Sequence, residues 1–300
     1  MMSFAAGVGF ANVDLLYGGM SAIPQESEEI YARDFNMKLG GGIPATMINL
    51  GRLGIPVRLG SFTGHDFFSK FAEEKIKETG VEYRNLYSGD GMPVTLTSAI
   101  ITANDRAFVS YTDGAEINEK VIEDVYSVIK GAKVADMDAN FIDAYKQAKS
   151  EGTKLVFDMG WDGEMTLEKY KECLEIADFY TPNTKEALRI TGADTVEKAA
   201  DILSNYFEYV IIKLDKKGTL VKHNGKSNVI EPLPGITRID STGAGDAFMT
   251  GFLYGLYNDM DVCKCAAYGN VLGGLCVAGY GCLIDNLSEE LVKEQVKKIL

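Results

Sequence analysis

The stretch Asp240-Ser-Thr-Gly-Ala-Gly-Asp246, followed at once by AFMTGFLYGL, decides the fold and points to the chemistry. Gly243 and Gly245 allow a tight backbone turn that exposes successive N–H groups. The apolar run predicts a helix over Gly245–Tyr257, whose first N–H groups and positive dipole end face the turn. Such a turn binds anions and suits phosphate. Because Asp246 can take a proton from a hydroxyl beside that turn, the stretch predicts phosphoryl transfer.

Strand-like and helix-like runs alternate along most of the chain. Alternation of this kind predicts an α/β fold with a mostly parallel central sheet and helices on both faces. No Pro-, Gly- or Ser-rich linker divides the chain, so we expect a single domain over residues 1–300. The expected strands are 57–62, 133–136, 154–158 and 208–214, and the other expected helices are 66–78, 140–150, one from about 262 and one capped by Ser288.

Two further segments break the parallel pattern because polar and apolar residues alternate in them. Tyr31–Met37 is typical of an antiparallel strand, and Val94–Tyr111 is typical of a hairpin around the turn TANDR. Strands with a polar face do not belong in a fully buried parallel sheet. We therefore expect a small β lid, formed by segments at about 12–38 and 92–112, over the ligand-binding edge of the main sheet.

The stretch DSTGAGDAF resembles the DTxGAGD signature of the ribokinase-like (PfkB) carbohydrate kinases, and the resemblance extends over essentially the whole chain. It implies a ribokinase-like fold and an ATP-dependent kinase that uses Mg²⁺. It also implies that Asp246 is the catalytic base and that the backbone of Gly243, Ala244 and Gly245 forms the anion hole. Asp240 and Thr242 match positions that often help to bind a monovalent cation in that family, which makes K⁺ a candidate ligand.

A glycine-rich block at Gly40–Gly54 resembles the GGxxxNxAxxLxRLG signature of the same family. The glycines let the backbone approach a ligand closely, and a helix is expected to begin near Pro44. The resemblance implies that the backbone of Gly41 and Gly42 helps to orient the substrate. Ala45 stands where the family has an Asn that contacts the sugar, which leaves the identity of the substrate open. Taken alone, the block also fits a turn that packs a helix.

The first predicted strand ends in Gly7-Val-Gly-Phe-Ala-Asn-Val-Asp14. Asn12 and Asp14 are two residues apart, so on a strand they face the same side and can bond neighbouring hydroxyl groups. The family places a substrate-binding acid here, which Asp14 matches. A nicotinamide-dependent oxidoreductase is an alternative, but a dinucleotide fingerprint requires Gly at the position of Asn12 and a helix directly after it.

Three more segments resemble parts of the family's nucleotide site. Asn183 and Glu186 form a capping box at a helix start and also match the NxxE motif near Mg²⁺ and the phosphates. Lys213 and Gly218 lie where a strand turns towards the nucleotide phosphates, although a solvated lysine turn is an alternative interpretation. Asn270 resembles a position that lines the adenine pocket.

The bulk composition argues against several classes of binding partner and of targeting or membrane segment. A net charge of -13 and a pI of about 4.7 argue against nucleic acid and against an anionic membrane as partners. The five cysteines include no CxxC pair and suggest reduced thiols in the cytoplasm. Met1–Gly9 lacks a basic region and fits a first strand better than a signal peptide. The uncharged run 265–284 is long enough for a bilayer, but its glycines favour a buried helix followed by a turn.

The expected function is transfer of a phosphoryl group from ATP to a hydroxyl of a sugar-like metabolite, and a primary hydroxyl is the expected acceptor. Fructose, ribose, a 2-keto-3-deoxy acid and a phosphosugar all remain open, and a phosphosugar would require basic residues near the lid, such as Arg33, Lys38 or Arg106. A nucleoside kinase of the same fold and a non-catalytic sugar- or nucleotide-sensing protein are the alternatives. A homodimer through the lid, with Tyr31–Met37 as the edge, is also open.

Overall fold

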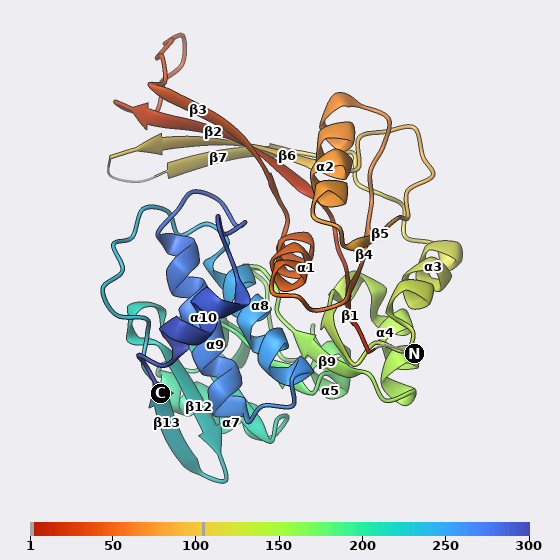
Figure 1. The fold of residues 1–300 in the computed structure, drawn as a ribbon, viewed down its shortest axis with the longest axis vertical. Helices are drawn as coiled ribbons and strands as arrows, with labels where there is room; N and C mark the ends of the chain where they lie inside the picture. The colour runs from red at the N-terminus through yellow and green to blue at the C-terminus, as the bar shows by residue number, and fades with distance from the viewer. Residues whose placement is uncertain (1–2, 104–105) are drawn as a thin grey trace.

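The computed structural model describes residues 3–103 and 106–300, and in these residues a six-stranded parallel sheet in the order β10-β9-β8-β1-β4-β5 forms the centre (Figure 1). The expected α/β fold with a mostly parallel sheet is confirmed. Met1 and Met2, which belong to the expected first strand, lie outside the described residues. The strands are Phe179–Tyr180 (β10), Lys154–Phe157 (β9), Val134–Met137 (β8), Ala5–Val8 (β1), Val57–Ser61 (β4) and Glu82–Asn85 (β5).

Helices cover both faces of the sheet because successive strand residues point to opposite sides. Ala5 on β1 lies in one buried cluster with apolar residues of α1, α8 and α9, whereas Ala6 and Val8 lie in a second cluster with residues of α3, α4, α6 and α7. The helices are Gly42–Arg52 (α1), Phe67–Glu78 (α2), Glu119–Ile129 (α3), Ile142–Ser150 (α4), Lys171–Ile176 (α5), Thr184–Thr191 (α6), Val196–Leu203 (α7), Ala244–Tyr257 (α8), Val262–Val277 (α9) and Glu289–Val296 (α10), with 3₁₀ turns at Ala139–Phe141 and Asp215–Lys217.

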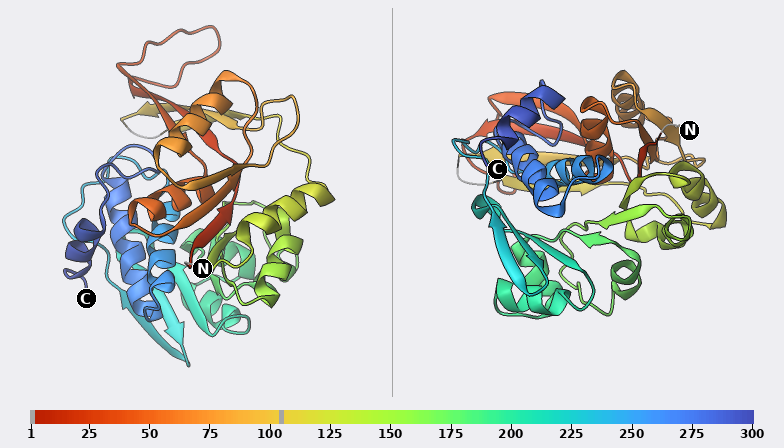
Figure 2. Two further views of the ribbon diagram at one scale, coloured as in Figure 1. Left: turned by 45° about the vertical axis from the view of Figure 1, so that its right-hand side comes forward. Right: turned by 60° about the horizontal axis from the view of Figure 1, so that its bottom comes forward.

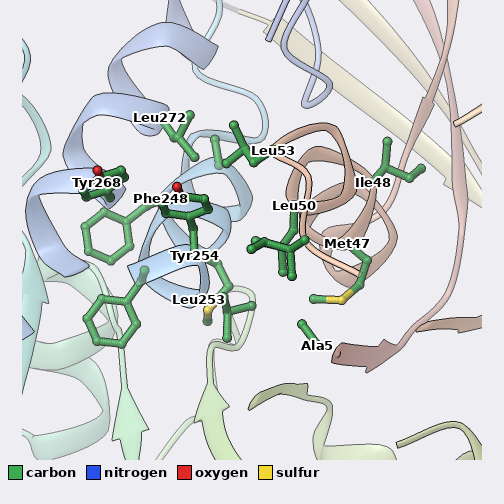
Figure 3. Close-up of a cluster of buried hydrophobic side chains, with 14 of the residues drawn as sticks. Ala5, Met47, Ile48, Leu50, Leu53, Phe248, Leu253, Tyr254, Tyr268 and Leu272 are labelled. Atoms are coloured by element: carbon green, nitrogen blue, oxygen red, sulfur yellow. The ribbon is translucent and has the colours of Figure 1, made fainter. Parts of the chain in front are cut away.

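The core between α1, α8 and α9 fixes the position of the turn that precedes α8 (Figure 3). Large side chains from all three helices fill it, and the rings of Tyr254 and Tyr268 stack at 5.1 Å. Glycines bring α8 and α9 together, because a Cβ at Gly251 would lie 2.3 Å from the carbonyl oxygen of Tyr268. The core side chains include Met47 and Leu50 from α1, Phe248 and Leu253 from α8, and Leu272 from α9.

A second sheet, in the order β3-β2-β6-β7, lies over the α1 and α8 end of the molecule (Figures 1 and 2). Its strands are Asn12–Met20 (β2), Asp34–Gly40 (β3), Thr95–Thr102 (β6) and Arg106–Tyr111 (β7). β6 and β7 pair antiparallel, as the predicted hairpin requires, although Asn104 and Asp105 of its turn lie outside the described residues. The strand predicted from Tyr31 begins instead at Asp34, because β2 pairs with β3 only as far as Gly18, opposite Asp34.

The expected strand 208–214 is β11 (Tyr209–Lys213), but it pairs antiparallel with β12 (Thr219–His223) and not with the central sheet. A hairpin then joins β12 to β13 (Lys226–Ile230), and this hairpin was not predicted. Its turn is Asn224-Gly225, with φ of 49° and 72°. The Asn-Gly pair is the signal that could have revealed it, since tight hairpin turns favour these residues at positive φ.

The uncharged run 265–284 forms most of α9, which ends at Val277, and then a loop. This confirms the expected buried helix and turn. In the part of the chain that the structure describes, none of the helices combines the length and the apolar character needed to cross a membrane. The cysteines are free thiols, and four of them are buried.

The close contact between α8 and α9 predicts that any side chain at Gly251 lowers the stability of the fold. We expect Gly251→Ala to lower the free energy of unfolding by about 2–3 kcal/mol, because the added methyl group would overlap the backbone of α9. Urea unfolding followed by circular dichroism measures this loss. Gly163→Ala is the matched control, since no atom lies within 4 Å of its Cβ position, and it should change stability by less than about 0.5 kcal/mol. Equal stability of the two variants would contradict the prediction.

Candidate active site

The N-terminus of α8 carries the first part of the site. Gly243, the N-cap residue, is left-handed at φ 76°, and a Cβ there would lie 2.2 Å from Cβ of Cys282, so only glycine fits. The N–H groups of Ala244–Asp246 open the helix and have no partner within it. A Cβ at Gly245 would lie 3.5 Å from Nζ of Lys213, so this turn combines backbone donors with an ammonium group. The arrangement fits a phosphate.

Asp246 lies in the first turn of α8 and is anchored by its backbone. Its carbonyl oxygen accepts a hydrogen bond from the hydroxyl group of Thr46 (3.2 Å), which ties α8 to α1, and one from Thr250 (3.0 Å) within α8. The carboxylate faces the start of α1, where a Cβ at Gly42 would lie 3.4 Å from Oδ1 of Asp246. The fold therefore anchors Asp246 through its backbone and places its carboxylate beside the Gly42 backbone.

The environment of Asp246 makes it a better base than an ordinary aspartate. Burial and, to a lesser extent, the nearby negative charges of Asp158 and Asp14 raise its pKa to about 6, although the positive charge of Lys213 opposes them. A carboxylate with a pKa near the working pH combines a large ionised fraction with useful basicity. The group can therefore accept a proton near neutral pH.

The turn Gly40-Gly41-Gly42 runs past two carboxylates. A Cβ at Gly40 would lie 2.6 Å from Oδ2 of Asp14, and Gly42 borders Asp246. Gly41 has φ of 99°, which side chains rarely adopt. The sequence-predicted residues Asp14, Gly41, Gly42 and Asp246 are therefore brought together, with the glycine backbone between the two acids.

Asn12 and Asp14 lie at the root of β2 and share a hydrogen-bond chain. Nδ2 of Asn12 donates to Oδ1 of Asp14 (2.6 Å), and the Thr97 hydroxyl donates to Oδ1 of Asn12 (3.1 Å). Burial raises the pKa of Asp14 to about 6, although the bond from Asn12 lowers it and the charge of Asp240 adds to the rise. Thr97, which sequence reasoning missed, also lies 2.9 Å from the hydroxyl of Ser110.

Lys213 ends β11 inside a group of acids. Its Nζ lies 2.6 Å from Oδ2 of Asp158, and the two side chains are 13% and 17% exposed. Burial lowers the pKa of Lys213, but the charges of Asp158 and Glu186 outweigh it and keep the ammonium form. Sequence reasoning missed Asp158. Its place directly after the buried strand β9 was the available signal, because ligands bind at the carboxyl ends of parallel strands.

Asn183 and Glu186 form the expected capping box at the start of α6. Oδ1 of Asn183 accepts from N of Glu186 (3.0 Å), and Oε2 of Glu186 accepts from N of Asn183 (2.8 Å). Burial and then Asp158 raise the pKa of Glu186, while Lys213 lowers it. An isolated bridge between Asn183 and Lys213 brings this helix start to the same sheet edge.

Within the described ranges, no cluster of three or more His, Cys, Asp or Glu side chains could hold a metal ion by itself. Mg²⁺ typically binds through one or two carboxylates, waters and substrate phosphates. The buried carboxylate of Glu186, close to Asp158 and Lys213, fits that donor set.

Gly218 and Asn270 hold the hairpin in place. Gly218 has φ of 84°, and a Cβ there would lie 2.0 Å from the carbonyl oxygen of Ile230. The Asn270 amide accepts from Thr219 (2.6 Å) and donates to the carbonyls of Ile230 (2.9 Å) and Glu231 (3.0 Å). Both residues therefore fix the β12–β13 hairpin, and the side-chain amide of Asn270 already has protein partners.

Asp240 lies under the turn, 7% exposed, and is surrounded by donors. Oδ1 accepts from N (2.9 Å) and Oγ1 (2.8 Å) of Thr242 and from Arg106, and Oδ2 accepts from N of Gly281 (3.2 Å). Burial opposes ionisation, but these bonds and the Arg106 charge hold the pKa of Asp240 below its usual value. Nζ of Lys38 donates to the Tyr280 carbonyl (3.1 Å).

Comparison with known proteins identifies the family. Residues 11–289 match the profile of the pfkB family of carbohydrate kinases. A 5-dehydro-2-deoxygluconokinase of Clostridium perfringens is 26% identical over 89% of this chain and 86% of its own. The structure of Arabidopsis thaliana ribokinase complexed with ribose and ATP superposes with a TM-score of 0.84 at 21% identity, over 99% of each chain. The structure of the Methanocaldococcus jannaschii nucleoside kinase superposes with a TM-score of 0.79 at 21% identity, also over 99% of each chain.

The chain belongs to the pfkB family of carbohydrate kinases. It is therefore an ATP-dependent kinase that phosphorylates a sugar, and the expected ribokinase-like fold is confirmed.

The raised pKa of Asp246 predicts that this residue lowers stability. Its folded-state pKa is about 6 against an ordinary 3.8, so the folded state binds this proton more tightly, and stability falls as pH rises between these values. We expect Asp246→Asn to raise the free energy of unfolding by about 2 kcal/mol at pH 8, with the gain vanishing below about pH 4.

Urea unfolding across this pH range measures the difference. Asp143→Asn is the control, because that carboxylate is 69% exposed and the substitution should leave stability nearly unchanged at each pH. An Asp246→Asn variant no more stable than the parent at pH 8 would show that the carboxylate is not destabilised in the fold.

Proposed function

We propose that this kinase transfers the γ-phosphoryl group of ATP to a hydroxyl of a sugar, with Asp246 as general base. The observation that carries the proposal is the position of the Asp246 carboxylate. It lies at the N-terminus of α8, beside the anion-binding turn and across the Gly40–Gly42 backbone from Asp14. A sugar bound along the Gly40–Gly42 backbone could contact Asp14 while one of its hydroxyl groups meets both Asp246 and the turn that binds the transferring phosphoryl group.

The proposed step is a direct in-line transfer. The hydroxyl oxygen forms a bond to the γ-phosphorus while the bond between that phosphorus and the β,γ-bridging oxygen breaks, so that ADP leaves. Asp246 accepts the hydroxyl proton, which typically contributes about 10²–10⁴-fold. The N–H groups at Gly243, Ala244 and Gly245 stabilise the charge on the transferring group, with a single such donor worth about 3 kcal/mol.

Lys213 and Glu186 bind the phosphate groups of ATP in this proposal, Lys213 directly and Glu186 through Mg²⁺. Lys213 points its ammonium group at the Gly245 turn and is held there by Asp158, which fits a positioning role for that acid. Glu186, whose backbone N–H donates to Oδ1 of Asn183 (3.0 Å), would help to hold Mg²⁺. When bound, Mg²⁺ neutralises charge on the phosphates. Gly218 and Asn270 then shape the adenine side without direct polar contacts.

The lid face that meets the body favours a sugar over a nucleoside. Lys38, Asp14, Thr97 and Ser110 are register partners in neighbouring strands, so they form one polar row across the sheet. Hydroxyl groups of a sugar match such a row of donors and acceptors, whereas a nucleobase requires an apolar or aromatic slot. A phosphosugar is disfavoured, since Lys38 and Arg106 contact protein groups and Arg33 lies at the far end of β2, beside Gly19.

A homodimer through the lid is a further part of the proposal. The opposite face of the lid carries exposed apolar side chains, including Phe35 (56%), Val109 (71%) and Tyr111 (59%). Exposed apolar patches of this kind often mark protein interfaces. A second copy of the chain, with the same patch, would cover it by two-fold symmetry.

An ATP-consumption screen tests the activity. It covers ribose, fructose, 5-dehydro-2-deoxygluconate, other sugar acids, phosphosugars and nucleosides. We expect turnover on a free sugar or sugar acid, and a fall of at least about 10³-fold in kcat for Asp246→Asn with ATP binding retained. Asp143→Asn should keep full activity. Comparable turnover by Asp246→Asn would refute the base, turnover on nucleosides alone would favour a nucleoside kinase, and ligand binding without ATP use would favour a sensing protein.

The pKa values of Asp246 and Asp14 predict the pH profile. Both acids must be ionised, one to accept the proton and one to bind hydroxyl groups, and burial raises both pKa values to about 6. We expect kcat/KM to rise with pH, with a midpoint near pH 6 and a two-proton slope below it. Asp14→Asn should lower kcat/KM and reduce the slope to one proton. A profile flat from pH 5 to 8 would contradict both assignments.

A further inference from the structure

Asp240 and Thr242 match the positions of a monovalent-cation site, but in this chain their oxygen atoms already accept hydrogen bonds from protein groups. Both carboxylate oxygens of Asp240 accept from protein donors. The carbonyl oxygen of Thr242 accepts from the Cys276 thiol (3.4 Å), and that thiol also donates to the carbonyl of Gly281 (3.5 Å). A bound alkali cation requires several oxygens with free lone pairs pointing at one centre. These residues do not fit one.

Arg106 supplies the positive charge instead. It is the first residue of β7 in the lid, and its Nη1 donates both to Oδ1 of Asp240 and to Oγ1 of Thr242 (2.8 Å), while Nη2 donates to Oγ of Ser241 (2.9 Å). The guanidinium carbon also lies 5.3 Å from the ring centre of Phe108. These bonds cover three consecutive residues at the start of the signature stretch, 134 residues away along the chain.

We infer that the guanidinium of Arg106 takes the place of a monovalent cation beneath the phosphate-binding turn, so that the kinase does not depend on K⁺. A buried carboxylate without a positive partner is costly, and Arg106 provides both the charge and directed hydrogen bonds. The inference deepens the proposed function, on which its activity measurements rest, because it identifies a positioning residue for the anion-binding turn.

The location of Arg106 couples the turn to the lid. Ser241 and Thr242 lead directly into Gly243 and the first N–H groups of α8, so the bonds from Arg106 fix the approach to the anion hole. Lys38, on another lid strand, adds a second contact at Tyr280 beside Gly281. A lid that moved away would remove the counter-charge of Asp240 and loosen the turn. Arg106 therefore completes the phosphate site only while the lid lies against the body.

The test compares the parent, Arg106→Ala and Arg33→Ala in KCl and in tetramethylammonium chloride at equal ionic strength. Arg33 is the matched control, because it is an exposed lid arginine at the far end of β2. For the parent and for Arg33→Ala, we expect kcat to differ by less than about twofold between the salts. For Arg106→Ala in tetramethylammonium, we expect kcat to fall by about tenfold or more. KCl, or guanidinium at low millimolar concentration, should restore kcat to within about threefold of the parent.

Thermal unfolding without substrate provides a readout independent of activity. In tetramethylammonium the Tm of Arg106→Ala should fall by about 4 °C, and KCl should restore it in a saturable manner, since a cation that binds only the folded state raises its stability. A parent activated severalfold by K⁺ would overturn the inference. Unchanged kcat and Tm in Arg106→Ala would overturn it too, as would a loss that neither K⁺ nor guanidinium restores. If the parent shows no kinase activity but the Tm of Arg106→Ala still depends on K⁺, the inference stands and the proposed function is refuted.

Discussion

The charge balance around Lys213 is the interaction on which the site depends. One buried ammonium group serves the carboxylates of Asp158, Glu186 and Asp246, which converge at the carboxyl edge of the parallel sheet. Asp136, which is fully buried nearby, has its pKa raised well above the usual value, first by burial and then by Asp158 and Asp246. This concentration of negative charge is unfavourable in the resting protein. It suits a site that receives phosphate with Mg²⁺, because the added cation changes the local balance.

Buried carboxylates on the two sides of the anion-binding turn are therefore stabilised in two different ways. On one side several carboxylates share the single ammonium group of Lys213. Negative charge therefore exceeds positive charge there, which helps to keep the pKa of Asp246 raised. On the other side Asp240 is matched by directed hydrogen bonds and by Arg106, which keeps its pKa low. The first arrangement leaves Asp246 with a raised pKa, whereas the second fixes a loop. Burial alone would have raised both pKa values, so the difference comes from hydrogen-bond donors and from the charges of the neighbouring side chains.

The sequence was informative where local chemistry decides structure. The glycine spacing at 243 and 245, the capping box at Asn183 and the cap at Asp66 each act within a few residues, and the structure has all three. It was less informative about pairing between distant segments. The placement of β11 beside β12 follows from a hairpin whose Asn-Gly turn was overlooked. The pairing of Asp158 with Lys213, the bond from Thr97 to Asn12 and the contact of Arg106 with Asp240 depend on three-dimensional proximity, although the place of Asp158 at the end of a buried strand was a local signal.

The packing of α1 against α8 has a consequence for how the chain is made. α1 lies in the first fifth of the sequence and α8 in the last, yet Thr46 and Thr250 bond across them and Met47 and Leu50 share their core. During synthesis from the N-terminus, the apolar face of α1 must therefore wait, uncovered, until almost the whole chain has left the ribosome. Long-range contacts of this kind also slow folding. The nascent protein thus displays Asp14 and the Gly40–Gly42 turn well before it has either a finished core or the carboxylate of Asp246.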